Sequence, residues 1–186
     1  IKNIVITYTV SDNMHKTVTH MFDHGTSVHY TIGEDGFQNQ FHDENQSAFY
    51  AGRSSWLNQI SLNANSIGIM LLNNAESEFP EMQITQLINL IHDINDRHAA
   101  ELNVVGLGEI TVGRDKNAHI APGTQFPWHE LAKNGIGKHV SIPDGTSAEC
   151  HININDKSDA VKDAQEKLIE HGYGIEATGI FDKKTE

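Results

Sequence analysis

The chain has 186 residues, a net charge of −12 and a single cysteine, Cys150. Its length suits one globular domain with a small appendage, and one cysteine excludes an internal disulfide. The acidic charge argues against nucleic acid as a partner, because phosphate binding needs a clustered basic surface. No apolar run approaches the ~18 residues of a membrane-spanning helix. Ile1 begins directly in a strand-like run without a secretion signal, so we expect a trimmed mature protein.

The first part of the chain predicts strands with one short helix among them. β-Branched and apolar runs indicate buried strands, and Asp35-Gly36 is a hairpin turn signal. The run from Asn65 to Leu72 is the most apolar, which favours a central strand buried on both faces. In chain order we expect a strand over residues 4–8, a helix over 17–22, and strands over 28–32, 37–41 and 65–72.

Pro80 precedes a clear helical pattern, in which apolar residues recur at helical spacing over about 85–102. A short strand begins at Val104, a long loop runs to Pro122-Gly123, and a short helix follows Phe126. Alternating strands and helices predict an α/β fold with a central mixed sheet flanked by helices.

A second unit follows a polar stretch without periodicity. Ser158 can cap a helix that Gly172 would end. Because the pattern stops near Thr185, we expect this unit to be partial. The predicted division is a domain over 1–140, a linker over 141–157 that holds Cys150 as an inert thiol, and a partial helical unit over 158–186.

Six segments together carry a resemblance to a known family. Ala48-Phe49-Tyr50-Ala51-Gly52 stands where that family has A-W-H-A-G, and Gly106-Leu107-Gly108-Glu109-Ile110 with Gly113-Arg114 where it has G-H-x-D-I-x-x-G-R. The other segments are 4–9, 27–32 with Asp35-Gly36, 66–73, and Pro122-Gly123 with 126–131. In this order they resemble the type-2 N-acetylmuramoyl-L-alanine amidases, which share a fold with peptidoglycan recognition proteins. Residues 161–182 separately resemble a peptidoglycan-binding module of cell-wall hydrolases.

The resemblance implies a zinc site whose residues are replaced here. The family's zinc ligands, two His and one Asp or Cys, fall on Thr7, Leu107 and Ala121, and its acid/base falls on Met70. Leucine and alanine cannot coordinate a metal, and a neutral threonine hydroxyl is a poor ligand. Buried His and Asp side chains without a metal would be unpaired and costly, whereas the compact or apolar side chains found here carry no such cost. We therefore expect no zinc and no intact catalytic set.

The same resemblance implies residues that contact a ligand. The family's oxyanion donor falls on His119, with Lys116 as the alternative in a loop that is longer than usual. The competing interpretation is that His119 and Lys116 are exposed loop residues without a role in binding. The expected ligand-binding residues are Tyr30, Tyr50, Trp56, Asn63, Arg114 and His119.

Three functions remain open from the sequence. The first is a periplasmic, secreted or wall-associated protein that binds peptidoglycan or muropeptides without cutting them. The second is an active amidase that cleaves the bond between N-acetylmuramic acid and L-alanine through a relocated metal site, for which the available side chains are His24, His29, His42, Glu109 and His119. The third is a protein-interaction or inhibitor role, for which the sequence offers no specific patch.

Overall fold

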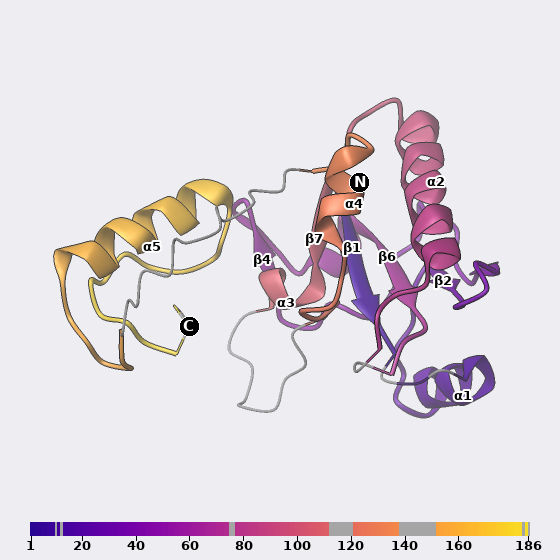
Figure 1. The fold of residues 1–186 in the computed structure, drawn as a ribbon, viewed down its shortest axis with the longest axis horizontal. Coiled ribbons are helices and arrows are strands. Elements are labelled where there is room, and N and C mark those ends of the chain that lie inside the picture. Colours follow the sequence, from indigo (N-terminus) through magenta and orange to yellow (C-terminus); the bar gives the residue numbers. More distant parts are fainter. Residues whose placement is uncertain are drawn as a thin grey trace.

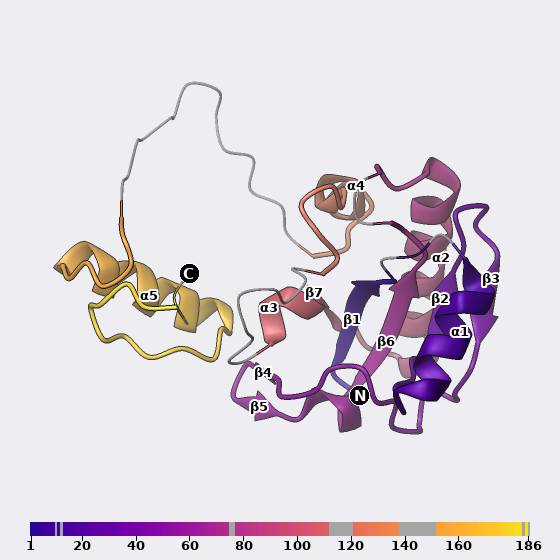
Figure 2. The same cartoon turned by 90° about the horizontal axis from the view of Figure 1, so that it is seen from below.

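The computed structural model describes residues 1–9, 11, 13–74, 77–111, 121–137, 152–183 and 185. These residues form a five-stranded sheet in the order β3-β2-β6-β1-β7, with helices on both of its faces (Figures 1 and 2). The strands of this sheet are β1 (Asn3–Tyr8), β2 (Tyr30–Ile32), β3 (Gln38–Gln40), β6 (Ser66–Leu71) and β7 (Asn103–Gly106). The predicted fold class, a mixed sheet flanked by helices, is confirmed.

The sheet is parallel except at one edge. β2, β6, β1 and β7 pair in parallel, and β3 returns antiparallel to β2 through the predicted hairpin. β6 lies in the middle of the order, as its unbroken apolar run predicted. Parallel pairing places the carboxyl ends of β6, β1 and β7 at one edge, where loops can build a site.

One face of the sheet is covered by α2 (Glu81–His98), with α4 (Trp128–Lys133) beside it. Leu87, Ile91 and Ile94 pack on Ile4 and Ile6 of β1 in a fully buried apolar cluster. The expected helix bounds, 85–102, were wrong at both ends. Pro80 is the N-cap with extended backbone, and Ala99 ends the helix in the left-handed region.

The misplaced end of α2 has a local cause. Leu102 is buried in the same cluster but lies beyond the helix. Its backbone N–H is bound by the Asn95 side chain, with 3.1 Å from N to Oδ1. A buried leucine therefore extended the apolar pattern past the true helix end.

The opposite face carries smaller elements, several of which the sequence did not predict. α1 (Met14–Asp23) lies on the face opposite α2 (Figure 2), and its Met14 contacts Thr31 of β2. The expected helix over 17–22 is therefore longer. The unpredicted elements are β4 (Ser55–Trp56), β5 (Gln59–Ile60), the 3-10 turn η1 (Leu62–Ala64) and α3 (Leu107–Ile110), which occupies the start of the expected loop.

α5 (Asp159–His171) is the helix of the C-terminal region. Ser158 caps it by accepting the N–H of Val161 at 3.2 Å, and Gly172 ends it at φ +112°. Both ends agree with the prediction. Most of the expected linker, including Cys150, lies outside the described residues, so the division at 141–157 stays a prediction.

The C-terminal region contacts the sheet-bearing part at β4. The N–H of Leu57 donates to the Gly172 carbonyl at 2.9 Å, and the rings of Trp56 and Tyr173 meet edge to face with 5.2 Å between centroids. Within the described residues, no helix has the length and apolarity needed to span a membrane.

Candidate functional site

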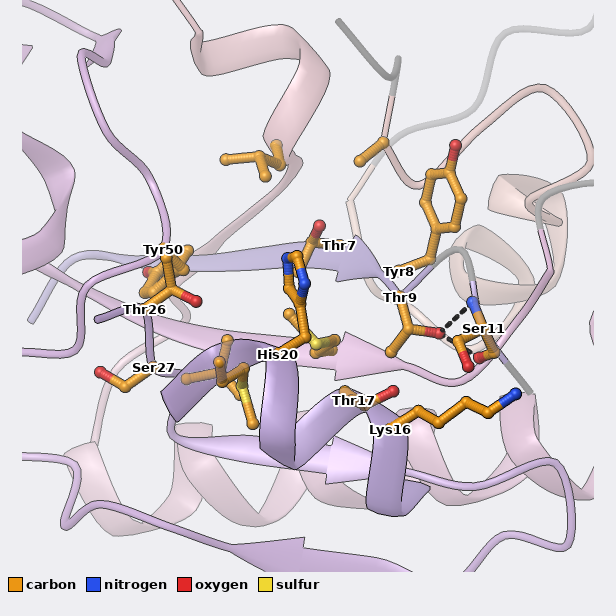
Figure 3. A pocket seen from close by; sticks show the side chains of 15 residues that line it. Thr7, Tyr8, Thr9, Ser11, Lys16, Thr17, His20, Thr26, Ser27 and Tyr50 are labelled. Carbon is orange, nitrogen blue, oxygen red and sulfur yellow. Dashed lines mark hydrogen bonds between the residues drawn. The ribbon is translucent and has the colours of Figure 1, made fainter. Parts of the chain in front are cut away.

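A groove opens beside the carboxyl ends of β6 and β1, on the face that carries α1 (Figure 3). It encloses a cavity of about 690 Å³. Its lining residues are Thr7, Tyr8, Thr9, Ser11, Lys16, Thr17, His20, Met21, Thr26, Ser27, Val28, Tyr50, Met70, Leu107 and Ala121. The groove therefore joins β1, β6, α1 and the segments that follow β7.

The floor of the groove comes from neighbouring positions of two parallel strands. Thr7 of β1 pairs in register with Met70 of β6. Successive side chains of a strand point to opposite faces, so Ile6 enters the core beneath α2 while Thr7 faces the groove. The hydroxyl of Thr7 has no hydrogen-bond partner among the described residues, although only 3% of the residue is exposed.

The far wall is apolar. Leu107 begins α3 directly after β7, and the N–H of Gly108 donates to the Ala121 carbonyl at 2.7 Å, which brings Ala121 beside it. Leu107 is 7% exposed and Ala121 4%. Both pack into a second apolar cluster with Val5 and Ile110.

Tyr50 closes one end of the groove. A Cβ on Gly68 would lie 2.5 Å from Tyr50 Cε1, so the tyrosine ring occupies space that only glycine leaves open. The Tyr50 hydroxyl donates to Ser66 Oγ at 2.5 Å, since Ser66 itself donates to the Leu62 carbonyl. Burial raises the pKa of the Tyr50 phenol. Tyr50 is therefore a neutral, fixed hydrogen-bond donor.

Asn63 positions this tyrosine without lining the groove. Its Oδ1 accepts the N–H groups of Tyr50 and Ala51 at 3.2 and 2.8 Å. Of the expected ligand-binding residues, Tyr50 alone among those described lines the groove. Arg114, Lys116 and His119 lie outside the described residues.

Tyr30 and Trp56 have partners elsewhere in the fold. The Tyr30 hydroxyl donates to Glu44 Oε1 at 2.7 Å, and Arg97 and His98 bind the same carboxylate. Trp56 is 8% exposed and packs on Tyr173 of the C-terminal region. Neither borders the groove, and a part for them in ligand binding remains only a prediction from the resemblance.

The five family positions do meet in one place. Thr7, Met70, Leu107, Ala121 and Tyr50 all line the same groove, although they are spread along the chain. This set does not fit a zinc ion. Leucine and alanine offer no donor atom, and methionine thioether and neutral hydroxyl groups are poor zinc ligands. Within the described part of the chain, no group of three or more His, Cys, Asp or Glu could hold a metal ion.

Three of the described side chains that could have supplied a relocated site, His24, His29 and Glu109, are hydrogen-bonded within the fold, and His119 lies outside the described residues. His29 is fully buried; its Nδ1 accepts the Gly68 N–H at 2.9 Å and its Nε2 donates to the Gln46 carbonyl at 3.0 Å. His42 lies edge-on to His29, and burial lowers the pKa of His29. Both ring nitrogens of His29 are thus committed to the backbone.

His24 and Glu109 are engaged as well. His24 Nδ1 donates to the His20 carbonyl at 2.9 Å. Glu109 accepts the Gly106 N–H at 2.5 Å and the Tyr173 hydroxyl at 3.2 Å. Among the described candidates for a relocated metal site, none lines the groove.

Two groove residues on α1, Lys16 and His20, were missed from the sequence. They stand four positions apart, so they share one helix face, and Figure 3 shows the His20 ring rising from α1 toward β1. His20 also stacks on His24, with 4.0 Å between ring centroids. No sequence signal marked them, because which face of α1 meets the sheet is seen only from the burial of Thr17 and Met21 in the structure.

Comparison with known proteins places these observations in a family. Residues 1–129 match the Amidase_2 family, described as N-acetylmuramoyl-L-alanine amidase. A curated relative, the putative N-acetylmuramoyl-L-alanine amidase RC0497 of Rickettsia conorii, is 42% identical over 188 residues, covering 98% of this chain and 70% of its own length.

Solved structures are similar to this chain as well. The amidase AmiD of Escherichia coli, in complex with anhydro-N-acetylmuramic acid-L-Ala-D-γ-Glu-L-Lys, aligns at TM-score 0.73 and 29% identity, covering 95% of this chain and 73% of that one. AmpDH3 of Pseudomonas aeruginosa, in complex with anhydromuramic pentapeptide, aligns at TM-score 0.73 and 27% identity, covering 96% and 76%. The groove at the strand ends and these matches agree: the chain belongs to the N-acetylmuramoyl-L-alanine amidase family, Amidase_2.

Proposed function

We propose that this chain binds muropeptides, the sugar–peptide units of peptidoglycan, in the groove between α1 and the sheet without hydrolysing them. One observation carries the proposal. The positions that hold zinc in the family, Thr7, Leu107 and Ala121, meet in the groove, and two of the three have no atom that can coordinate a metal.

The family reaction depends on what these positions lack. A catalytic zinc needs three protein ligands, lowers the pKa of its bound water toward ~7 and polarises the amide carbonyl. A nearby acid or base then moves the proton, and the position of that group is Met70. With no zinc ligands at these positions and methionine at the acid/base position, the groove lacks the groups with which the family activates water, so we assign no hydrolytic step to it.

The groove retains features suited to binding. Its volume of about 690 Å³ lies within the usual range for small-molecule sites. Eight of its 15 lining side chains carry a hydroxyl group, and the Thr7 hydroxyl is open to a ligand. Sugars and peptides present hydroxyl and amide groups that such side chains can bind. The apolar wall of Leu107 and Ala121 offers contact for methyl groups.

We also infer the setting in which binding occurs. The relatives include amidases solved with muropeptide fragments, which favours a periplasmic, secreted or wall-associated protein. Residues 158–186, joined through 141–157, would form a partial wall-binding unit beside the domain of residues 1–140. Its contact with β4 through Trp56 and Tyr173 would hold that unit against the domain.

The test combines retention and release. The protein is mixed with insoluble peptidoglycan, with and without added zinc, and the supernatant is analysed chromatographically for freed peptide. We expect retention and no release. The variant Thr7→His/Met70→Glu/Leu107→His/Ala121→Asp restores the family's ligand types and an acid/base, and serves as the comparison for metal-dependent release.

A second arm asks whether the groove is the binding site. Thr26→Trp narrows the Tyr50 end, where Thr26 lines the groove, and should weaken retention. Thr19→Trp is the matched control, because Thr19 is exposed on the same helix as Lys16 but does not line the groove. Equal retention of both variants on peptidoglycan would show that the groove is not the binding site.

An active amidase is the second candidate, and the names of the curated relatives favour it. Stoichiometric zinc together with peptide release by the unmodified protein would establish it. An absence of peptidoglycan binding, with a stable protein complex recovered instead, would favour the interaction role.

A further inference from the structure

The α1 side of the groove differs in charge from the rest of it. This side is lined by Lys16, Thr17, His20 and Met21. Their spacing along α1 places all four on one face of the helix. Among the lining residues that the structure describes, Lys16 carries the only permanent charge, and none is an aspartate or glutamate. The described lining therefore carries one permanent positive charge and no negative one, in a chain whose net charge is −12.

Among the residues that the structure describes, no acidic group neutralises Lys16. The described residues include no ion-pair partner for its amino group, whereas Lys133 and Lys162 both pair with glutamates. An unpaired ammonium group beside a groove attracts a carboxylate, and low-dielectric walls strengthen that attraction. The charge of Lys16 is thus available to a bound molecule.

The groove is polarised along its length. Figure 3 shows Lys16 and Ser11 at one end and Tyr50 with Ser27 at the other, with Thr7 between them. The Tyr50 end carries hydroxyl groups and no charge, so it suits neutral sugar or amide groups. The Lys16 end suits an anion, which would orient a bound ligand with one of its carboxylates toward Lys16.

The Lys16 end is also held in place by the sheet edge. Thr9 Oγ accepts the N–H of Ser11 at 3.0 Å and that of Asn73 at 3.2 Å. Ser11 and Asn73 form an antiparallel bridge. A fixed rim lowers the entropic cost of binding, because fewer groups must be ordered when the ligand arrives.

We propose that Lys16 is a specificity-determining residue, which binds a free carboxylate of the peptide part of a muropeptide. This rests on the proposed function. The ligand bound by the relative AmiD contains D-γ-Glu. A glutamyl residue linked through its γ-carbon keeps a free α-carboxylate, and the last residue of the peptide carries a second one. The sugar in that compound has no carboxylate outside the amide bond, so the peptide is the source.

The test compares three ligands by isothermal titration calorimetry: anhydro-N-acetylmuramoyl-L-Ala-D-γ-Glu-L-Lys, the same compound amidated at the glutamyl α-carboxylate, and the same compound amidated at the terminal carboxylate. The unmodified protein should bind the free acid about tenfold more tightly than one of the amidated forms, because a charge-assisted hydrogen bond is lost. The form that loses affinity identifies the carboxylate. The preference should shrink at high salt.

Variants assign that preference to Lys16. Lys16→Met should bring the affinity ratio to about one while leaving affinity for the amidated form unchanged. Lys16→Arg should keep the preference. Lys167→Met removes the same charge from an exposed position on α5 and should behave as the unmodified protein.

Each failure has a separate meaning. Equal binding of all three ligands, or a tenfold preference that survives in Lys16→Met, overturns the role of Lys16 and leaves muropeptide binding intact. Binding of none of them overturns the proposed function together with this inference. Peptide release during the titration contradicts the non-hydrolytic proposal alone.

Discussion

The two faces of one sheet show how differently a core and a site are built from the same strands. On β1, Ile4 and Ile6 point into the apolar cluster beneath α2, while Val5 and Thr7 point to the opposite face. The α2 face is closed by one amphipathic helix. The groove face is assembled from α1, Tyr50 and α3, which come from distant parts of the chain.

The two faces depend on different features of the sequence. Burial beneath α2 requires only that apolar residues recur at the period of the helix and alternate on the strands. The groove face requires particular neighbours, such as a glycine under a tyrosine ring. Substitutions should therefore cost stability on the first face and alter shape or binding on the second.

The largest expected effect is on the α2 face. Ile69→Ala should lower the free energy of unfolding by about 2–5 kcal/mol, because Ile69 is fully buried and leaves a cavity. Met70→Ala, at the next position of β6, should cost clearly less, because Met70 is partly exposed to the groove. Urea denaturation of both variants measures the difference. Equal costs would contradict the contrast between the faces.

A second test breaks the groove face at its tightest contact. Gly68→Ala should destabilise by about 1–3 kcal/mol, because the new methyl group enters the space of the Tyr50 ring. Tyr50→Ala has its own cost but removes that ring, so adding Gly68→Ala to it should cost little more. A thermal denaturation cycle over the four proteins measures the coupling; additive costs would show that the contact does not hold in solution.

Burial of His29 predicts that the stability of the protein depends on pH. Burial lowers the pKa of His29, with His42 lowering it further and the Gln46 carbonyl and Glu44 opposing. The unfolded chain, with a histidine pKa of about 6.5, then binds the proton first. Stability from His29 is thus fully present above about pH 6.5 and is lost as the pH falls through the interval below it.

The variant His29→Gln should flatten this pH dependence. Urea midpoints at pH 5.5 and 7.5 should differ less than in the unmodified protein. His92→Gln is the control, because His92 is exposed on α2, and it should keep the full difference. A slope unchanged in His29→Gln would assign the pH dependence to other groups.

The smallest effect is expected where the C-terminal region contacts α3. Tyr173→Phe removes the hydrogen bond from the Tyr173 hydroxyl to Glu109 and should cost about 0.5–1.5 kcal/mol. Tyr173→Ala should cost more, because it also removes the ring contact with Trp56. Denaturant titrations distinguish the two; the same cost for both would mean that the ring contact contributes little.

Much of the fold could be predicted because its signals are local. The central position of β6 followed from an unbroken apolar run, and the ends of α5 followed from Ser158 and Gly172. α3 was not predicted, because a helix of four residues is too short to show a periodic pattern of apolar residues. The end of α2 was misplaced because Leu102 is buried after the helix has stopped.

The site could be predicted only in part. Five positions that the family resemblance singles out, including Thr7 and Met70, line the groove, and their part in binding stays a prediction. Lys16 and His20 did not follow from the sequence, because their place depends on how α1 lies over the sheet. Trp56 packs on Tyr173. This contact joins segments that are distant in sequence, so no local pattern could predict it.

The most direct test of the central claim is the zinc content of the purified protein by elemental analysis, after zinc loading and desalting. We expect close to no zinc per chain, because Leu107 and Ala121 supply no ligand. The variant Thr7→His/Leu107→His/Ala121→Asp, treated identically, provides the comparison. Zinc near one per unmodified chain would show that a metal site exists and would overturn the assignment of a metal-free groove.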